Sequence, residues 1–175
     1  MAADEAAIFL SQERTVICAT NGRDGFPHLM PLWYVVRDDA SSSKVELWAW
    51  TFAKSQKVRN LERDPRATLQ IEAGTEYMQL RGVMLKADVT IHRDTDVVTK
   101  LGLELYRRYA PAGSEHLSDD VREMVRAQAP KRVALQFSER SRATWDHRKL
   151  AGASGRPLRR PPRARSRGSS GARCG

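Results

Sequence analysis

Cysteine is scarce in this chain of 175 residues, and so are long apolar runs. Cys18 lies within an apolar segment and Cys174 stands next to the last residue, so neither a disulfide framework nor a cysteine-based metal site is predicted. No apolar run approaches the roughly 18 to 20 residues that cross a bilayer. Asp4 and Glu5 precede only a short apolar stretch, which is unlike a secretion signal. We therefore expect a cytoplasmic protein.

Several catalytic signatures are also missing. The sequence contains no G-x-G-x-x-G after a strand, no G-x-x-x-x-G-K phosphate loop, no H-E-x-x-H, no C-x-x-C and no G-x-S-x-G. These absences argue against a protein-borne nucleophile and against a catalytic metal.

The excess of positive charge is confined to the C-terminal end. The chain has 30 Lys and Arg against 21 Asp and Glu, but residues 148–175 hold nine of the basic residues and no acidic one. After Leu150 the composition is almost entirely Arg, Pro, Gly, Ala and Ser, which buries too little apolar surface to offset the entropy of ordering. We expect one folded domain over 1–149 and a disordered basic tail over 150–175. Nucleic acid is expected to bind only through that tail.

Most of the predicted elements are short strands joined by turns. Strands are expected at residues 14–20, 26–36, 45–51, 66–73, 77–92 and 132–137, with an edge segment at 142–145, a bend at Gly82 and a hairpin turn at 21–25. Helices are expected at residues 4–10, 55–64, 94–109 and 118–127. The strand 26–36 is apolar on both faces, so we expect both faces to be covered. Strand hairpins with single helices inserted predict a closed antiparallel barrel with helices at its mouth.

One concentrated feature stands where the third strand runs into its helix, over residues 51–61. The first amides of a helix lack partners and its dipole favours negative charge. Ser55, Gln56 and Lys57 would therefore present N–H groups, a hydroxyl and an ammonium to a phosphate. On composition alone, a solvated basic face of a surface helix is the commoner outcome.

Three segments together resemble a known family. They are Gly25-Phe26-Pro27-His28-Leu29-Met30-Pro31-Leu32-Trp33-Tyr34, then Lys54-Ser55-Gln56-Lys57-Val58-Arg59-Asn60-Leu61-Glu62-Arg63-Asp64-Pro65-Arg66, and Leu80-Arg81-Gly82. Their order and spacing resemble the pyridoxamine 5'-phosphate oxidase-like superfamily, and within it the actinobacterial flavin/deazaflavin oxidoreductases of the B group. The resemblance runs from about Ala6 to Lys149. It implies an antiparallel split β-barrel with flanking helices, forming a homodimer with each cofactor between protomers.

The resemblance also implies which residues contact the cofactor. The ring would be lined by Pro31, Leu32 and Trp33 with Trp50 and Thr51 beside it, the phosphate would be held by Ser55, Gln56, Lys57 and Arg59, and Tyr77, Gln79 and Arg81 would come from the opposite subunit.

A flavin-type cofactor performs the hydride chemistry itself, which agrees with the absence of a catalytic triad. Coenzyme F420 is preferred to FMN because Lys54, Arg59 and Arg63 would attract its anionic glutamyl tail. The predicted function is an F420-dependent oxidoreductase that transfers a hydride between the deazaflavin and a small unsaturated or quinone-like substrate. The alternatives are an FMN-binding flavoprotein and a non-catalytic cofactor carrier or sensor.

Two further features have bland interpretations. His28 fits a hydrogen-bonded structural histidine, with substrate contact as the alternative. Trp33, Trp48 and Trp50 fit core or interface packing at least as well as stacking on a ring. The segment 145–148 lacks the Arg-Leu-x-x-Arg arrangement of authentic pyridoxamine phosphate oxidases, so oxidation of vitamin B6 is not expected.

Overall fold

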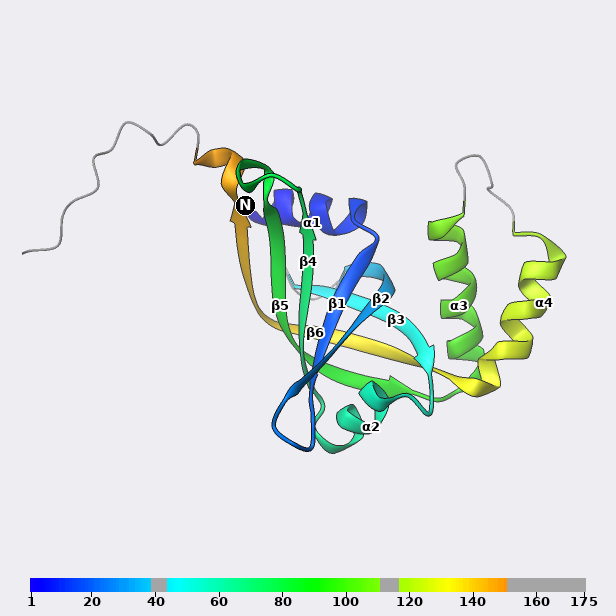
Figure 1. Cartoon of the computed structure of the whole chain (residues 1–175). Coiled ribbons are helices and arrows are strands. Elements are labelled where there is room, and N and C mark those ends of the chain that lie inside the picture. The colour runs from blue at the N-terminus through cyan, green and yellow to red at the C-terminus, as the bar shows by residue number, and fades with distance from the viewer. Residues whose placement is uncertain (39–43, 111–116, 151–175) are drawn as a thin grey trace, which may run out of the picture.

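The computed structural model describes residues 1–38, 44–110 and 117–150, and within them six antiparallel strands close into a barrel (Figure 1). The strands are β1 (Thr15–Asn21), β2 (Pro27–Asp38), β3 (Val45–Phe52), β4 (Arg66–Ala73), β5 (Arg81–His92) and β6 (Arg132–Asp146). Their order around the barrel is β1-β2-β3-β6-β5-β4. The predicted barrel is thus confirmed, whereas nearly all of the predicted tail lies outside the described residues.

The helices surround this barrel. They are α1 (Ala3–Gln12), α2 (Gln56–Arg63), α3 (Thr95–Tyr109) and α4 (Asp119–Gln128), with short 3-10 turns η1 (Tyr77–Gln79), η2 (Ala129–Lys131) and η3 (His147–Lys149). In Figure 1, α1 and α2 lie at opposite ends of the barrel, and α3 and α4 stand together on one side of it. None of the helices in the described parts of the chain combines the length and apolarity needed to cross a membrane.

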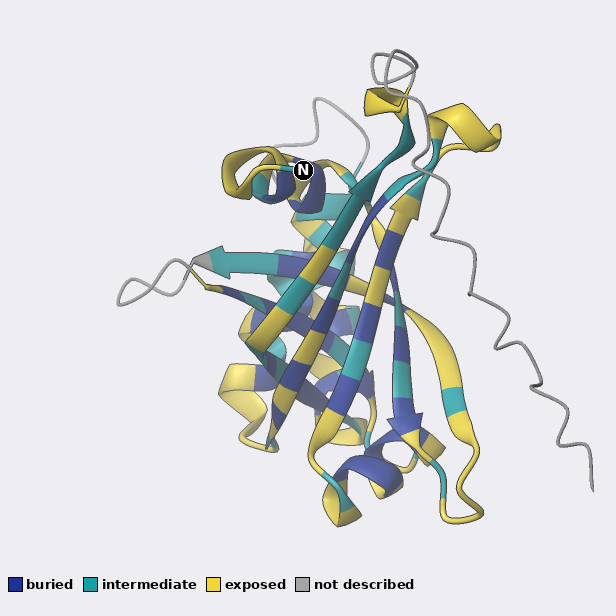
Figure 2. Cartoon of the chain, turned by 90° about the vertical axis from the view of Figure 1, so that its left-hand side faces the viewer, coloured by how far each residue is buried: buried dark blue, intermediate teal, exposed yellow. Residues whose placement is uncertain are grey.

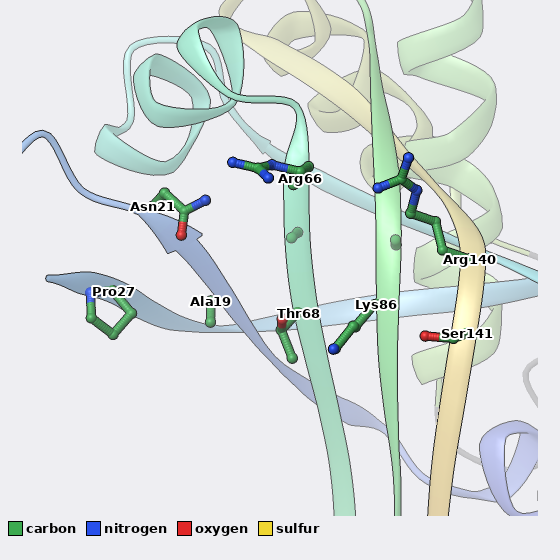
Figure 3. Close-up of a pocket in the computed structure, with 10 residues that line it drawn as sticks. Ala19, Asn21, Pro27, Arg66, Thr68, Lys86, Arg140 and Ser141 are labelled. Atoms are coloured by element: carbon green, nitrogen blue, oxygen red, sulfur yellow. The ribbon is translucent and has the colours of Figure 1, made fainter. Parts of the chain in front are cut away.

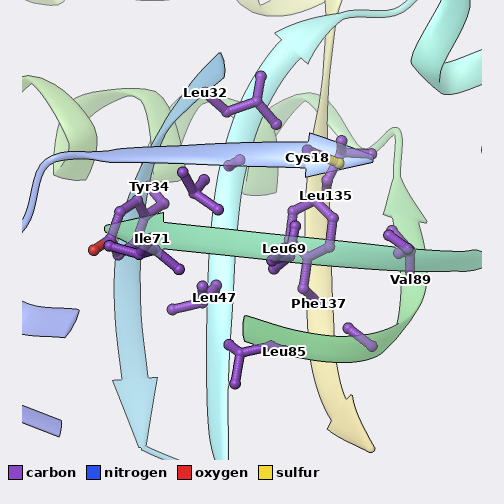
Figure 4. Packing of buried hydrophobic residues seen from close by; sticks show 14 of the residues in the cluster. Cys18, Leu32, Tyr34, Leu47, Leu69, Ile71, Leu85, Val89, Leu135 and Phe137 are labelled. Atoms are coloured by element: carbon purple, nitrogen blue, oxygen red, sulfur yellow. The ribbon is translucent and has the colours of Figure 1, made fainter. Parts of the chain in front are cut away.

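Alternating side chains build the core. Buried and exposed residues follow one another along the strands (Figure 2), because successive side chains point to opposite faces. The interior is filled by large apolar groups such as Tyr34, Leu69 and Phe137 (Figure 4). A second cluster packs Leu101 and Leu105 of α3 against the outside of the barrel. This packing holds α3 beside β2 and β3.

The two C-terminal strand segments expected at 132–137 and 142–145 are in fact one strand. β6 pairs with β3 over residues 132–138 and with β5 along almost its whole length. Arg140 has no partner in that pairing, because the register shifts between Lys86 and Ala87 of β5, and such an extra residue is a β-bulge.

Gly82 allows close packing of a neighbouring strand, whereas the register shift in β5 lies between Lys86 and Ala87. It pairs in regular register with Glu72 and Trp145. A Cβ at Gly82 would lie 2.1 Å from Cζ2 of Trp145 and 2.7 Å from the carbonyl oxygen of Ile71. The sequence predicted a bend at Gly82. The structure instead requires glycine here because the indole of Trp145 approaches the backbone closely.

β2 is covered on only one face over much of its length. Leu32 and Tyr34 are buried in the barrel, and Val35 packs on the α3 side. Leu29 and Trp33 are instead 56% and 52% exposed. The expectation that both faces are covered is therefore wrong for this stretch of the single chain.

Candidate functional site

The predicted anion-binding segment lies at the junction of β3 and α2. Helix α2 begins at Gln56, with Ser55 as its extended N-cap residue. The Ser55 side chain makes no capping bond, and its Oγ is buried with no hydrogen-bond partner in the described part of the chain. Val58 and Leu61 anchor the helix in the core, which positions its first turn.

Lys57 is the most unusual residue of this turn. Its side chain is only 6% exposed, and its Nζ donates to Oγ1 of Thr51 at 3.1 Å. It makes no ion pair with any described residue. Burial lowers the pKa of the Lys57 ammonium, because desolvation disfavours the charged form. A buried ammonium with one neutral partner is the arrangement that a bound anion would stabilise.

The structure brings six of the ten predicted residues into one cavity of about 340 Å³. They are Pro31, Leu32, Trp33, Trp50, Thr51 and Lys57. We call this space the cofactor cavity. Its remaining walls are Leu105, Tyr106 and Arg132, which the sequence did not single out.

Arg132 brings a second cation to the cofactor cavity from the start of β6. Its guanidinium carbon lies 4.2 Å and 4.0 Å from the ring centroids of Trp50 and Phe52, within the range of cation–π contacts. Its Nε and Nη2 donate to Oε1 of Gln128 at 3.0 Å and 2.6 Å. Burial lowers the pKa of Arg132, yet a guanidinium stays protonated in proteins. None of the described residues that line the cavity supplies a carboxylate to neutralise either cation.

Trp50 adds an unsatisfied donor to the same wall. Its indole Nε1 is buried and has no acceptor among the described residues. Buried donors without partners are uncommon, and each one calls for an acceptor from water or a ligand. Two cations and flat apolar walls together fit a ligand that carries both a phosphate and a ring.

The other predicted residues do not line this cavity. Gln56 faces a neighbouring cavity of about 390 Å³ and donates from Nε2 to Oδ1 of Asn60 at 2.9 Å. Arg59 is exposed on α2. Gln79, in η1, lies at the end of the barrel away from α2 (Figure 1), so within one chain it does not join the site.

His28 lines the same neighbouring cavity as Gln56. Its Nδ1 is buried and makes no hydrogen bond to any described residue. At this ring nitrogen the expected structural hydrogen bond is absent, and the substrate-contact interpretation stays open.

A larger cavity lies elsewhere, on the outside of β1, β4, β5 and β6, and has a volume of about 590 Å³ (Figure 3). Two of its three cations are neutralised, since Arg66 pairs with Asp64 at 2.7 Å and Arg140 pairs with Asp88 at 2.7 Å. It contains none of the predicted residues. We therefore assign the site to the cofactor cavity.

The described residues hold no cluster of three or more His, Cys, Asp or Glu suited to a metal ion. Cys18 is buried in the core, and burial raises the pKa of its thiol to about 12. It is therefore a thiol and not a reactive thiolate at neutral pH.

The chain is similar in sequence and in structure to known proteins. A family model described as pyridoxamine 5'-phosphate oxidase matches residues 2–143. A search of curated protein sequences finds no match. Among solved structures, the conserved hypothetical protein Rv2991 from Mycobacterium tuberculosis is 36% identical with a TM-score of 0.73, covering 86% of this chain and 88% of that one.

Two more distant structures show the fold alone. A protein titled F420 reductase is 20% identical with a TM-score of 0.57, over 78% of this chain and 94% of that one. The haem storage protein HutZ from Vibrio cholerae is 12% identical with a TM-score of 0.60, over 82% and 92%. Proteins that share this fold therefore have names that describe different chemistry. The function must be argued from the side chains of the site and not from the fold.

Proposed function

Because this chain belongs to the pyridoxamine 5'-phosphate oxidase family of flavin-binding split-barrel proteins, we propose that its cofactor cavity binds coenzyme F420 for hydride transfer to a small unsaturated or quinone-like substrate. The observation that carries the proposal is the buried, unpaired Lys57 in a cavity without carboxylates. An FMN-dependent oxidoreductase is the second candidate, since FMN carries a phosphate at the end of its ribityl chain and has a similar ring system.

Each part of the cavity has a separate task. Lys57 and Arg132 would hold the phosphate of the cofactor. Pro31 and Trp33 offer apolar surface that positions the ring and excludes water from it. The bound cofactor supplies the hydride chemistry, while the chain supplies binding, orientation and a dry environment.

The preference for F420 rests on charge around α2. Lys54, Arg59 and Arg63 are all exposed, on α2 or just before it. Their positive charge would attract the glutamyl tail of F420, which FMN lacks. Salt would weaken this attraction, because exposed charges are screened over about 10 Å at 0.1 M ionic strength.

A homodimer would complete the site. The exposed apolar face of β2 at Leu29 and Trp33 adjoins the cofactor cavity, because Trp33 lines it. A second protomer seated on that face would cover the cavity, and its η1 would be a source for Gln79.

The test is a titration of the purified full chain with F420 and FMN, followed by fluorescence. We expect micromolar affinity for F420, and Lys57→Met should weaken it at least tenfold, because a hydrogen bond to a charged group contributes about 1.5–3 kcal/mol. Lys100→Met is the matched control, since Lys100 is exposed on α3 and outside the cavity. Failure of both cofactors to bind at millimolar concentration would reject the proposal.

A separate measurement distinguishes an enzyme from a carrier. Reduced F420 is mixed with a quinone or an enone, with and without the protein, and its oxidation is followed. A rate unaffected by the protein, together with tight cofactor binding, would identify a carrier or sensor.

A further inference from the structure

A second, smaller cavity of about 230 Å³ lies against the cofactor cavity. We call it the aromatic chamber, and its walls are Trp33, Tyr106, Tyr109, Ala110, Leu117 and Val121. Trp33 and Tyr106 line both cavities, so the two spaces meet at these side chains. The chamber is thus placed where a second molecule would lie next to whatever fills the cofactor cavity.

The chamber has a rigid aromatic wall. Trp33 and Tyr109 stack with their ring centroids 4.3 Å apart and their planes 7° from parallel. The Tyr109 hydroxyl lies 2.5 Å from the carbonyl oxygen of Arg14 and accepts from the backbone N–H of Tyr34 at 3.0 Å. These bonds fix the Tyr109 ring and occupy its polar atom, so the wall offers flat apolar surface.

One polar group of the chamber is weakly engaged. The Tyr106 hydroxyl has the sulfur of Met124 as its partner at 4.0 Å, and a thioether is a poor acceptor. None of the described residues that line the chamber is charged. A ligand here would meet aromatic and aliphatic surface and one hydroxyl that is available to its carbonyl oxygen.

We propose that the aromatic chamber binds the hydride acceptor, and that this acceptor is an uncharged planar molecule of one or two rings. The inference rests on the proposed function for its redox step: the acceptor gains a hydride from the reduced cofactor and a proton from water, and the cofactor loses the same two electrons. The size agrees, because an apolar cavity of about 150 Å³ already holds benzene. An anionic acceptor is disfavoured, because Lys57 and Arg132 both line the cofactor cavity, where the cofactor phosphate would bind.

The test fills the chamber from α4. Val121→Phe adds a ring at a half-buried wall position, and Val97→Phe makes the identical change at an exposed position of α3 outside both cavities. The probe is tetramethyl-1,4-benzoquinone, whose binding to the full chain without cofactor is measured by equilibrium dialysis. We expect Val121→Phe to weaken this binding at least tenfold, and Val97→Phe to change it less than twofold.

The same variants are then assayed with reduced F420. Val121→Phe should raise the KM for the quinone at least tenfold while the Kd of F420 stays within twofold of the wild-type value. If Val121→Phe does not fold, Val121→Leu serves instead, with an expected weakening of about threefold.

The inference is overturned if the wild-type chain does not bind the quinone, if filling the chamber leaves binding unchanged, or if both variants weaken it equally. Because the dialysis contains no cofactor, its result is independent of the proposed function. A chain that binds neither F420 nor FMN but loses the quinone in Val121→Phe would reject the proposed function and keep the chamber as a ligand site.

Discussion

At the scale of single residues, the proposed site depends on the positive charge of Lys57, which its burial in the fold disfavours. Burial lowers the pKa of Lys57, so the folded chain holds this proton less firmly than the unfolded chain does. The charged Lys57 therefore reduces the free energy of unfolding in full below its lowered pKa. This cost shrinks as the pH rises above that pKa and is gone above the unfolded value of about 10.4. Binding of an anion has the opposite dependence, because it requires the ammonium.

We accordingly expect F420 affinity to fall as the pH rises through the lowered pKa of Lys57. Lys57→Arg should bind F420 with an affinity that depends less on pH, because a guanidinium does not deprotonate in this range. Fluorescence titrations from about pH 6 to about pH 10 check this, staying below the usual lysine pKa of about 10.4. An equal decline in the two proteins would assign the titration to another group.

At the scale of elements, Gly82 of β5 has no side chain, and this leaves room for the large side chain of Trp145 on the neighbouring strand β6. The indole of Trp145 occupies the space where a Cβ of residue 82 would lie. We expect Gly82→Ala to destabilise the chain by about 1–3 kcal/mol, as overpacking commonly does. Urea unfolding of the wild-type chain and of the variant measures this loss in the free energy of unfolding.

A double variant tests the cause of that destabilisation. Trp145→Leu in the Gly82→Ala background should recover part of the lost stability but not all, because the Ile71 carbonyl oxygen also lies too close, at 2.7 Å from the added Cβ. If the two changes are simply additive, the indole is not the obstacle.

At the scale of the whole molecule, an exposed apolar face of β2 argues for a partner copy. We expect a dimer at micromolar concentration by light scattering, and Leu29→Asp should shift it to monomer and weaken F420 binding. Ile8→Asp on α1 is the control, since Ile8 and Leu29 are 57% and 56% exposed. A monomeric wild-type chain, or equal dissociation by both variants, would refute this interface.

Local chemistry made the barrel predictable from sequence. Alternating apolar residues, the turn around Gly22 and Gly25, and the capping positions Ser118 and Asp94 depend only on neighbours a few residues away. The junction at Ser55 to Lys57 was predictable for the same reason. By contrast, residues 138–141 are polar and resemble a loop, and only pairing with β5 on either side of the bulge at Arg140 makes them part of β6.

What the sequence determined by itself is the set of strands and the helix start that brings Lys57 to the end of β3. Only the tertiary structure decided that Lys57 is buried, that Arg132 joins it, and that Tyr106 separates two cavities. Arg132 and Tyr106 lie far from Lys57 along the chain, so their approach depends on strand order and on the packing of α3. Burial and the charge balance of a cavity are properties of the assembled barrel, and no local pattern encodes them.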